Sequence, residues 1–491
     1  MSPLSNRLLV ACVLLVGCPK APPAPPAPPA PPKVFPVTPP VVTPDDSWMP
    51  TAPSAHKTVA SAPLWHAHRP GLPLVSLRII FPGGSALDPV DRPGETALSD
   101  AMLLRGAGER DSAAFSAALQ TEAISLHVNT HRTATVVSMD CTTQALPTAL
   151  DLLADALRAP RFASDEVERA TQQWVQSRKD AADDPRTVAS EVGWRVWYGD
   201  DSPYAHPTQG TIEGLEATTA ETLSRSWSRR AHPAQARWVA VGDIESDQLI
   251  GMLEARFGDW SAVETDASAL PPPPGGAGPL ATGGRVLVDN PGASQTVLRV
   301  MMPAWAPADP MRVAGDLGVV ALGGTFTSRL NALLREEKSY TYGARAGLTV
   351  GPGYGVVIAS TNVFRDVTGP ALTDLTAELR RIPEGVTEDE AGKARASRRT
   401  DAIEVAASRD GTADLLVSLA LSGSPQDGQL ADLKLGARAD AAAISSAVSM
   451  LSFDQGLVVV VGDLDKVEEA VTTALPGDWQ RVNIHGGDIP Q

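Results

Sequence analysis

Apolar and polar positions alternate along several stretches of this chain. The runs 74–81, 133–139 and 236–241 follow the period-two pattern of half-buried strands. Over 145–157 and 163–178 the apolar residues recur every three to four positions, which predicts amphipathic helices. Since strands and helices are not strictly interleaved one by one, the pattern predicts an α+β fold built on largely antiparallel sheets.

The same pattern occurs twice in the chain. "WVAVGDIE" matches "VVVVGDLD", and the glycines within them, Gly242 and Gly462, are 220 residues apart. "FGDW", which ends at Trp260, matches "PGDW", which ends at Trp479, at a separation of 219 residues. "VSLRIIFPGGSA" and "TVLRVMMPAWA" repeat at 221 residues. Three matches at nearly one offset predict two tandem copies of one domain.

The first residues have the features of an export signal. Arg7 supplies the positive charge, an apolar run follows over 8–16, and "LVGC" ends at Cys18. This ending resembles a bacterial lipobox, which implies that Cys18 is lipidated and becomes the mature N-terminus. The alternative is a membrane-spanning helix, but the run is about half the ~20 residues that a span needs. The absence of Asp after Cys18 favours the outer membrane, facing the periplasm.

Two proline-rich segments divide the chain. The segment 20–44 is predicted to be a polyproline II tether, because proline fixes φ and lacks a backbone donor. A second break, "LPPPPGGAGPL", separates the two copies. The predicted organisation is a signal peptide over 1–18, a tether over 19–56, a first domain over 57–268, a linker over 269–284 and a second domain over 285–485.

Charge and cysteine content exclude some functions. The chain has 41 Lys and Arg against 57 Asp and Glu, a net charge of -16, which argues against nucleic acid as a partner. Once Cys12 is removed with the signal peptide and Cys18 is lipidated, only Cys141 remains. No disulfide can then form within the mature chain. Cys141 follows an apolar strand and is expected to be buried rather than reactive.

A family resemblance rests on the order of several motifs. "VSLRIIFPGGSALDP", "RPGETALSDAMLLRGAG" and "DLLADALRAPRFASDEVERATQQW" follow one another in the first copy, and "LGGTFTSRLNALLREEKSYTYGA" lies in the second. Over about 59–483 the chain resembles the pitrilysin/insulinase family of zinc metallopeptidases. The resemblance implies two homologous α+β domains of the clamshell type, each with a mostly antiparallel sheet covered by helices.

The resemblance also shows what the first domain lacks. Active members carry H-x-x-E-H, in which two histidines bind zinc and the glutamate activates the metal-bound water. Aligned on Gly94 and on "LLRG", the two histidines fall on Ala97 and Ala101 and the glutamate on Asp100. The third zinc ligand of the family, a glutamate on a later helix, falls on Ser177. The resemblance therefore implies no intact catalytic residue and no metal ligand in this chain.

No other residues offer a replacement site. The eight histidines are scattered, and none lies close to a second His and a Glu in a known ligand pattern. His127 and His131 would project from one face of a strand, where a partly exposed pair is more often structural. A G-x-S-x-G nucleophile motif is missing from the sequence.

One functional element of the family persists in the second domain. In active clamshell members an arginine and a tyrosine seven positions apart hydrogen-bond the substrate next to the scissile bond. The matching residues here are Arg335 and Tyr342 in "LREEKSYTYGA". Arginine can donate to a carbonyl oxygen and a phenol can support a developing oxyanion. The alternative is that Arg335 pairs with Glu336 and that Tyr342 only begins a strand.

The resemblance supports three hypotheses. The first is a non-catalytic subunit that binds unfolded peptides and completes the active site of a zinc-bearing partner of the same family, with no cofactor of its own. The second is an envelope scaffold or peptide-binding protein without a proteolytic role. The third, a self-sufficient peptidase, requires a site that no motif indicates.

Overall fold

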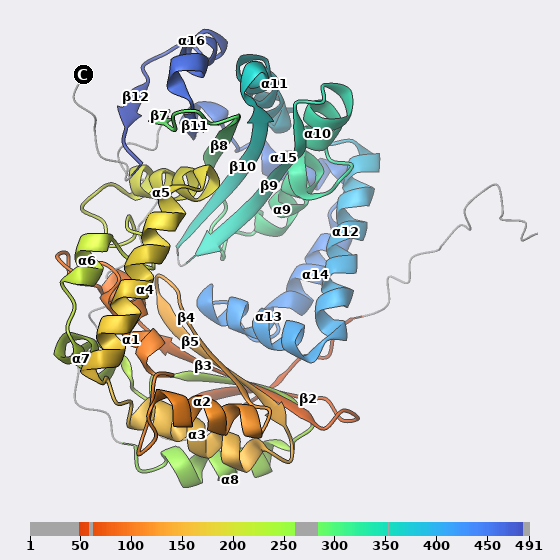
Figure 1. Ribbon diagram of the computed structural model, residues 1–491. Helices are drawn as coiled ribbons and strands as arrows, with labels where there is room; N and C mark the ends of the chain where they lie inside the picture. Colours follow the sequence, from red (N-terminus) through yellow and green to blue (C-terminus); the bar gives the residue numbers. More distant parts are fainter. Residues whose placement is uncertain (1–48, 58–61, 261–282, 352, 485–491) are drawn as a thin grey trace, which may run out of the picture. The chain divides into compact units, whose positions relative to one another are not determined.

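Two six-stranded sheets organise the residues that the computed structural model describes, namely 49–57, 62–260, 283–351 and 353–484. The predicted signal peptide, Cys18, the tether up to residue 48 and the linker up to residue 282 lie outside these residues, while the end of the predicted tether reaches into strand β1 (Ser54–Lys57). Figure 1 shows one sheet in each half of the chain. In spatial order, the first sheet contains β1 (Ser54–Lys57), β2 (Pro63–His68), β6 (Arg237–Gly242), β3 (Leu74–Pro82), β5 (Ala134–Thr142) and β4 (Ser125–Thr130). The second contains β12 (Gln480–Val482), β7 (Arg285–Asp289), β11 (Leu457–Gly462), β8 (Gln295–Ala304), β10 (Tyr354–Phe364) and β9 (Thr341–Gly351).

The two sheets share one topology. Five strands follow the order β2-β6-β3-β5-β4 in the first sheet and β7-β11-β8-β10-β9 in the second, so each strand occupies the place of its counterpart in chain order. Most neighbours are antiparallel, and the parallel pairs are β2 with β6, β7 with β11 and β7 with β12. The predictions of a duplication and of two mostly antiparallel α+β domains are confirmed. The exact limits of the domains stay predictions.

Helices connect the strands in both halves. Those of the first half are α1 (Glu95–Met102), α2 (Ser112–Thr121), α3 (Leu146–Arg158), α4 (Ser164–Ala182), α5 (Pro185–Tyr198), α6 (Ile212–Glu216), α7 (Ala220–Arg230) and α8 (Ser246–Phe257). Those of the second half are α9 (Arg312–Val319), α10 (Arg329–Asn331), α11 (Thr368–Arg381), α12 (Glu388–Ala407), α13 (Arg409–Leu421), α14 (Gly428–Arg438), α15 (Ala441–Val448) and α16 (Leu464–Ala474), with π-helical turns η4 (Val320–Gly324) and η5 (Ala332–Glu337).

One described helical run, Arg312–Glu337, is long and apolar enough to cross a membrane by length and composition alone. It includes α9, η4, α10 and η5, and 61% of its most apolar window is buried inside the protein. Leu322, Leu330 and Leu334 within it belong to the core of the second half. The run therefore packs as a core helix does.

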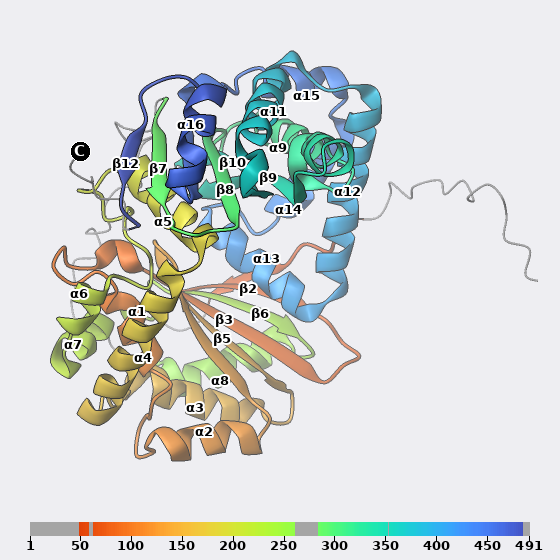
Figure 2. The same ribbon diagram turned by 45° about the horizontal axis from the view of Figure 1, so that its top comes forward.

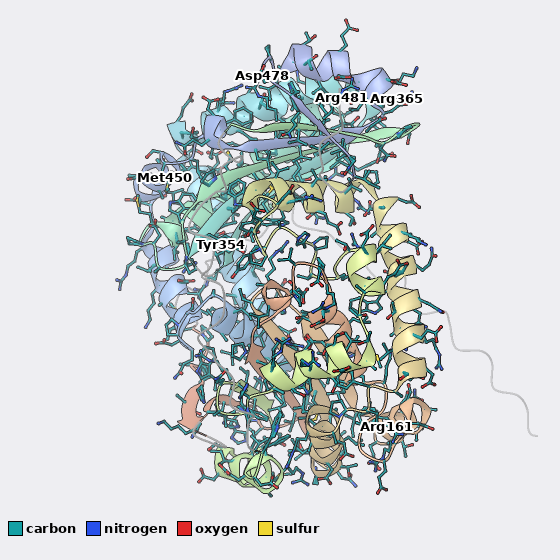
Figure 3. All side chains as sticks on the ribbon, turned by 90° about the vertical axis from the view of Figure 1, so that its left-hand side faces the viewer. Arg161, Tyr354, Arg365, Met450, Asp478 and Arg481 are labelled. Atoms are coloured by element: carbon teal, nitrogen blue, oxygen red, sulfur yellow. The ribbon has the colours of Figure 1, made fainter. Side chains whose placement is uncertain are left out.

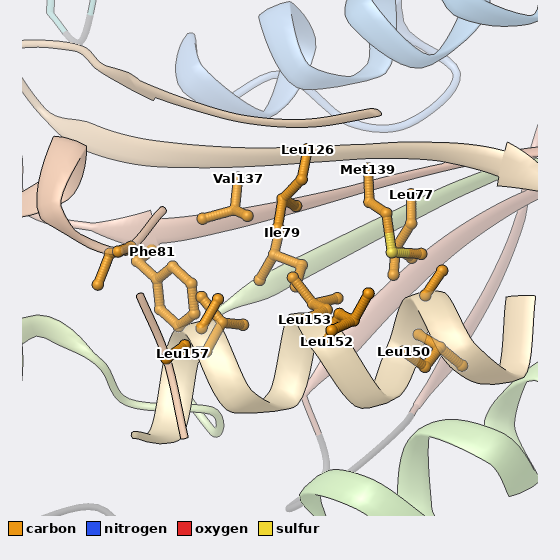
Figure 4. Packing of buried hydrophobic residues seen from close by; sticks show 14 of the residues in the cluster. Leu77, Ile79, Phe81, Leu126, Val137, Met139, Leu150, Leu152, Leu153 and Leu157 are labelled. Atoms are coloured by element: carbon orange, nitrogen blue, oxygen red, sulfur yellow. The ribbon is translucent and has the colours of Figure 1, made fainter. Parts of the chain in front are cut away.

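Because side chains alternate along each strand, one set of them points into a core between the sheet and the helices. Figure 4 shows Leu77, Ile79 and Phe81 of β3 above Leu153 and Leu157 of α3, and all five side chains are at most 2% exposed. Burying a side chain of this size contributes about 1.5–3 kcal/mol. The period-two strand and the amphipathic helix predicted from sequence thus meet in one core.

Each sheet is covered on its other face by a helix from the opposite half of the chain. Helix α13 contacts β3 and β6 of the first sheet, where Leu416 packs with Ile80 and Val239. Helix α5 contacts β8 and β11 of the second sheet, where Val192 packs with Met301. Figures 1 and 2 show α13 beside the first sheet and α5 beside the second. This reciprocal exchange binds the two halves through apolar surface.

Candidate functional site

Helix α1 begins immediately after a glycine that no other residue could replace easily. Gly94 has φ 101°, and a Cβ there would lie 2.8 Å from the Cα of Gly210. The carboxylate of Asp88 accepts hydrogen bonds from the backbone N–H groups of Gly94 and Thr96, each at 2.7 Å. These bonds satisfy donors that a helix N-terminus leaves unpaired. The segment "GETALSDAM" therefore forms a firmly anchored helix.

Asp100, at the position of the family's glutamate, is fully engaged in buried contacts. Its Oδ2 accepts hydrogen bonds from the hydroxyls of Thr130 and Thr135, both at 2.6 Å. Its Oδ1 accepts one from Arg230 Nη2 at 2.9 Å. The side chains of Asp100 and Arg230 are 1% and 4% exposed. A carboxylate held in this way by a buried cation is a structural group without access to solvent water.

At the two positions where active members of the family have zinc-binding histidines, this chain has alanines. Ala97 is 3% exposed and lies in the core, while Ala101 is half-buried. Helix α1 packs against α4, where Arg105 donates to Gln173 Oε1 at 2.7 Å. Methyl groups supply no donor atom for a metal.

Ser177 on α4, the predicted position of the third ligand, is exposed. Its hydroxyl cannot form a zinc site by itself, because zinc sites of peptidases take three protein ligands. Within residues 49–57, 62–260, 283–351 and 353–484, no three His, Cys, Asp or Glu side chains are grouped so that they could hold a metal ion. The residues at this place do not fit the zinc ion that active members of the family bind.

Arg335 and Tyr342 lie on consecutive elements of the second half, η5 and β9. The guanidinium of Arg335 stacks on Phe326, with 4.0 Å between its Cζ and the ring centre. Its Nε is 3.5 Å from Glu336 Oε1, and the side chain is 34% exposed. The predicted alternative contact with Glu336 is thus present but long. Because the side chains of Arg335 and Glu336 are both partly exposed to solvent, this ion pair contributes about 0–1 kcal/mol to stability.

The ring of Tyr342 projects outward from its strand. Tyr342 is 81% exposed, and its ring meets the edge of Phe364 with centroids 5.9 Å apart. The pairing of β9 with β10 shifts register between Thr361 and Val363, opposite this point. A bulge of this kind re-aims a side chain. Tyr342 is thus the second residue of β9 and presents its ring to solvent, and its role stays a prediction.

The remaining candidates behave as structural groups. Cys141 is 4% exposed, as expected, and burial raises the pKa of its thiol to about 11, so it is unreactive at neutral pH. His127 is exposed and its ring nitrogen lies 2.8 Å from the hydroxyl of Ser125. Neither residue belongs to a catalytic arrangement.

The sequence did not reveal the partners of Asp100. Arg230 lies at the end of α7, 130 positions later in the chain. The only available signal was the amphipathic pattern of α7, which has no direct link to α1. An alignment that locates a lost catalytic residue says nothing about the contacts that replace it.

Two family profiles match the chain. "Insulinase (Peptidase family M16)" matches residues 66–192, and "Peptidase M16 inactive domain" matches residues 218–398. An uncharacterised zinc protease of Streptomyces coelicolor is 22% identical over 302 residues, which make up 61% of this chain and 66% of that protein. A non-peptidase homologue of Helicobacter pylori is 22% identical over 194 residues, 40% of this chain and 45% of that protein. The chain thus spans less than two thirds of the length of these relatives.

Solved structures agree on the fold. A peptidase M16 inactive domain from Pseudomonas fluorescens has a TM-score of 0.76 at 21% identity and covers 84% of this chain and 98% of its own. A chain of complex III2 from Candida albicans has a TM-score of 0.69 at 15% identity, with 86% of this chain and 99% of its own covered. At such identities these matches establish the fold alone.

Proposed function

Because the chain belongs to the insulinase (M16) family, with both its N-terminal domain and its inactive C-terminal domain, we propose that it is a non-catalytic subunit of a heteromeric zinc peptidase. In this proposal it binds unfolded peptide and supplies Arg335 and Tyr342 to the active site of a partner that carries an intact H-x-x-E-H. Zinc is bound by the partner, and this chain holds none.

One observation carries the proposal. The position of the catalytic glutamate is committed to a buried ion pair, whereas Arg335 and Tyr342 remain in reach of solvent. An arginine stacked on an aromatic ring keeps its N–H donors free at the rim of the guanidinium plane. An exposed phenol can donate to a developing oxyanion.

A second candidate is a scaffold or peptide-binding protein of the cell envelope. The similarity to a non-peptidase homologue favours it, as does the similarity to a chain of a respiratory complex. Here Arg335 and Tyr342 would have no part in turnover. The two candidates differ in one measurable quantity, the activity of the partner in the presence of variants of this chain.

The test is a reconstitution. The chain is co-expressed with a family member that has an intact H-x-x-E-H, chosen first among the products of adjacent genes, and hydrolysis of an unfolded peptide is measured. Arg335→Ala and Tyr342→Phe should each lower kcat about a hundredfold, the usual cost of removing one oxyanion donor. Arg438→Ala, which removes an exposed arginine on α14, is the matched control and should leave turnover unchanged.

The amount of complex distinguishes the outcomes. Size-exclusion chromatography should recover each variant with the partner in wild-type yield, since neither side chain is buried. Full turnover by both variants in an intact complex would reject the catalytic role and leave the scaffold. Zinc bound by the purified chain alone at one ion per molecule, with peptide cleavage that a chelator stops, would reject both candidates.

We also propose that the chain is held at the bacterial envelope by a lipid on Cys18, with the proline-rich segment as a tether. The motif "LVGC" supports this proposal. Cys18→Ser should release the protein from the membrane fraction. Retention of this variant in the membrane would mean that a different anchor holds it.

A further inference from the structure

Arg299 lies in the middle of β8, on the face of the second sheet that α5 covers; we call it the α5 face. Its neighbours Leu298 and Val300 point into the core on the opposite face. Val297 and Met301, two positions away on either side, pack with α5. A Cβ built on Gly193 of α5 would be 3.5 Å from Arg299 Nε. Arg299 therefore lies directly beneath α5, at a position where the helix has no side chain.

This arginine has no counterion. Its Nε is buried without a hydrogen-bond partner, and no hydrogen bond or ion pair of its guanidinium is found within the part of the chain that the structure describes. Burial lowers the pKa of Arg299 to about 10. Arg299 is half-buried, and a cation partly removed from water without a carboxylate or another acceptor is costly to keep. An anion brought to this point would offset that cost.

The equivalent arginine in the first half shows what is missing. Arg78 occupies the same place in "VSLR" that Arg299 occupies in "TVLR". Its Nη1 is 3.0 Å from Asp140 on the neighbouring strand, and its Nε is 3.2 Å from Asp414 on the covering helix. In the second half the covering helix presents Gly193 in place of a carboxylate.

A second cation shares the α5 face with Arg299. Ser360 of β10 pairs with Arg299 of β8 on one side and with Arg345 of β9 on the other, so the three side chains form one row on one face. Neighbouring strands are about 4.8 Å apart, which places the Cα atoms of the two arginines about 10 Å apart. Arg345 is exposed, and a Cβ built on Gly347, two positions along the same face, would meet no atom within 4 Å. The row therefore opens to free space at β9.

We propose that Arg299, Ser360 and Arg345 form a binding site for a carboxylate of a peptide. Two guanidinium groups and a hydroxyl supply donors of the kind that bind carboxylates through charge-assisted hydrogen bonds. The inference rests on the proposed function, because it names the peptides that the chain binds as acidic ones. The carboxylate comes from an acidic side chain or from a peptide C-terminus, and the peptides chosen below separate these sources.

The test measures binding to the full chain without a partner. Three fluorescent unstructured peptides of equal length are titrated by anisotropy: a glutamate-rich peptide with an amidated C-terminus, its glutamine counterpart with an amidated C-terminus, and the glutamine peptide with a free C-terminus. The site predicts at least tenfold tighter binding of one carboxylate-bearing peptide than of the neutral one. Equal binding of all three, or no binding of any, would overturn it, while the partner assay would still decide the proposed function.

Variants assign the binding to these residues. Arg299→Met and Arg345→Met should each weaken binding of the preferred peptide about tenfold. Arg161→Met removes an exposed arginine of the first half (Figure 3) and should leave binding unchanged. Wild-type affinity of Arg299→Met would overturn the proposal.

A gain of charge gives an independent test. Gly193→Asp places a carboxylate above Arg299, as Asp414 stands above Arg78, and should abolish peptide binding. Gly193→Ala is its matched control, since both add a Cβ whose one tight contact is the flexible end of Met301, at 2.9 Å, with Arg299 at ordinary contact distance. Equal binding by the two variants would overturn the proposal, and thermal unfolding of each shows that it is folded.

Discussion

The two halves of this chain have one topology, but four of their charged groups are used differently. In the first half Asp100 is paired with Arg230, and Arg78 with two carboxylates. In the second half Arg299 has no carboxylate, and Arg335 keeps only a long contact to Glu336. At these positions the first half pairs its charges within the fold, whereas the second half leaves two arginines without a close carboxylate.

The strongest way to break this comparison is to remove Asp100. Asp100→Ala leaves the guanidinium of Arg230 buried without its counterion and two threonine hydroxyls without their acceptor. Breaking a buried pair from one side costs about 3–5 kcal/mol in the free energy of unfolding. Urea denaturation measures this loss. Ser177→Ala, at an exposed position of the same lost site, should stay within ~0.5 kcal/mol of the wild type.

A loss below about 1 kcal/mol for Asp100→Ala would contradict a structural role for this carboxylate. The site would then have kept a carboxylate for another reason. Asp100→Asn sharpens the measurement, because it keeps the shape and one acceptor oxygen while it removes the charge. The free energy of unfolding of Asp100→Asn should lie between those of the wild type and of Asp100→Ala.

The matched arginines give the second comparison. Arg78→Met should lower the free energy of unfolding by about 2 kcal/mol, less than a fully buried pair, because Asp140 and Asp414 are 22% and 69% exposed and can be hydrated. Both carboxylates lose a partner, and the link between the first sheet and α13 weakens. The same urea experiment measures it, with Arg161→Met as a surface control.

Arg299→Met, unlike Arg78→Met, should not lower the free energy of unfolding. Removing a half-buried charge that has no counterion costs no ion pair, so the variant should be as stable as the wild type or up to about 1 kcal/mol more stable. If it lost as much stability as Arg78→Met, Arg299 would be a structural residue with a partner, and the contrast between the two halves would fail. Midpoints of urea unfolding for the two variants, measured side by side, decide this.

Much of the fold could be predicted from the sequence. The period-two runs became β3, β5 and β6, and the repeated motifs gave two sheets with one strand order. These features are local or repeat at a fixed offset, so a single sequence contains them. The exchange of α5 and α13 between the sheets could not be predicted, because an amphipathic helix packs equally well on either of two similar apolar faces.

The candidate site was only partly predictable. That Ala97 and Ala101 cannot bind zinc follows from residue types alone, but the contacts of Asp100 depend on Arg230, which is close only in the folded chain. The isolation of Arg299 depends on the absence of a side chain at Gly193. That Arg299 lacks a carboxylate partner can be seen only when the fold shows which residue of α5 lies above it. The part played by Arg335 and Tyr342 stays a prediction.

The smallest expected effect on stability belongs to the exposed pair of the second half. Tyr342→Phe removes one hydroxyl that lies in solvent, and the ring keeps its edge contact with Phe364. Its free energy of unfolding should therefore stay within ~0.5 kcal/mol of the wild type. If the hydroxyl acts in catalysis on a partner, its removal should lower turnover and leave the free energy of unfolding unchanged. Substitution of Asp100 should have the reverse effect: it should lower the free energy of unfolding and leave turnover unchanged as long as the variant is folded. A clear loss of stability in Tyr342→Phe would show that the hydroxyl is part of the fold, and the division of roles between the two halves would then not hold at this residue.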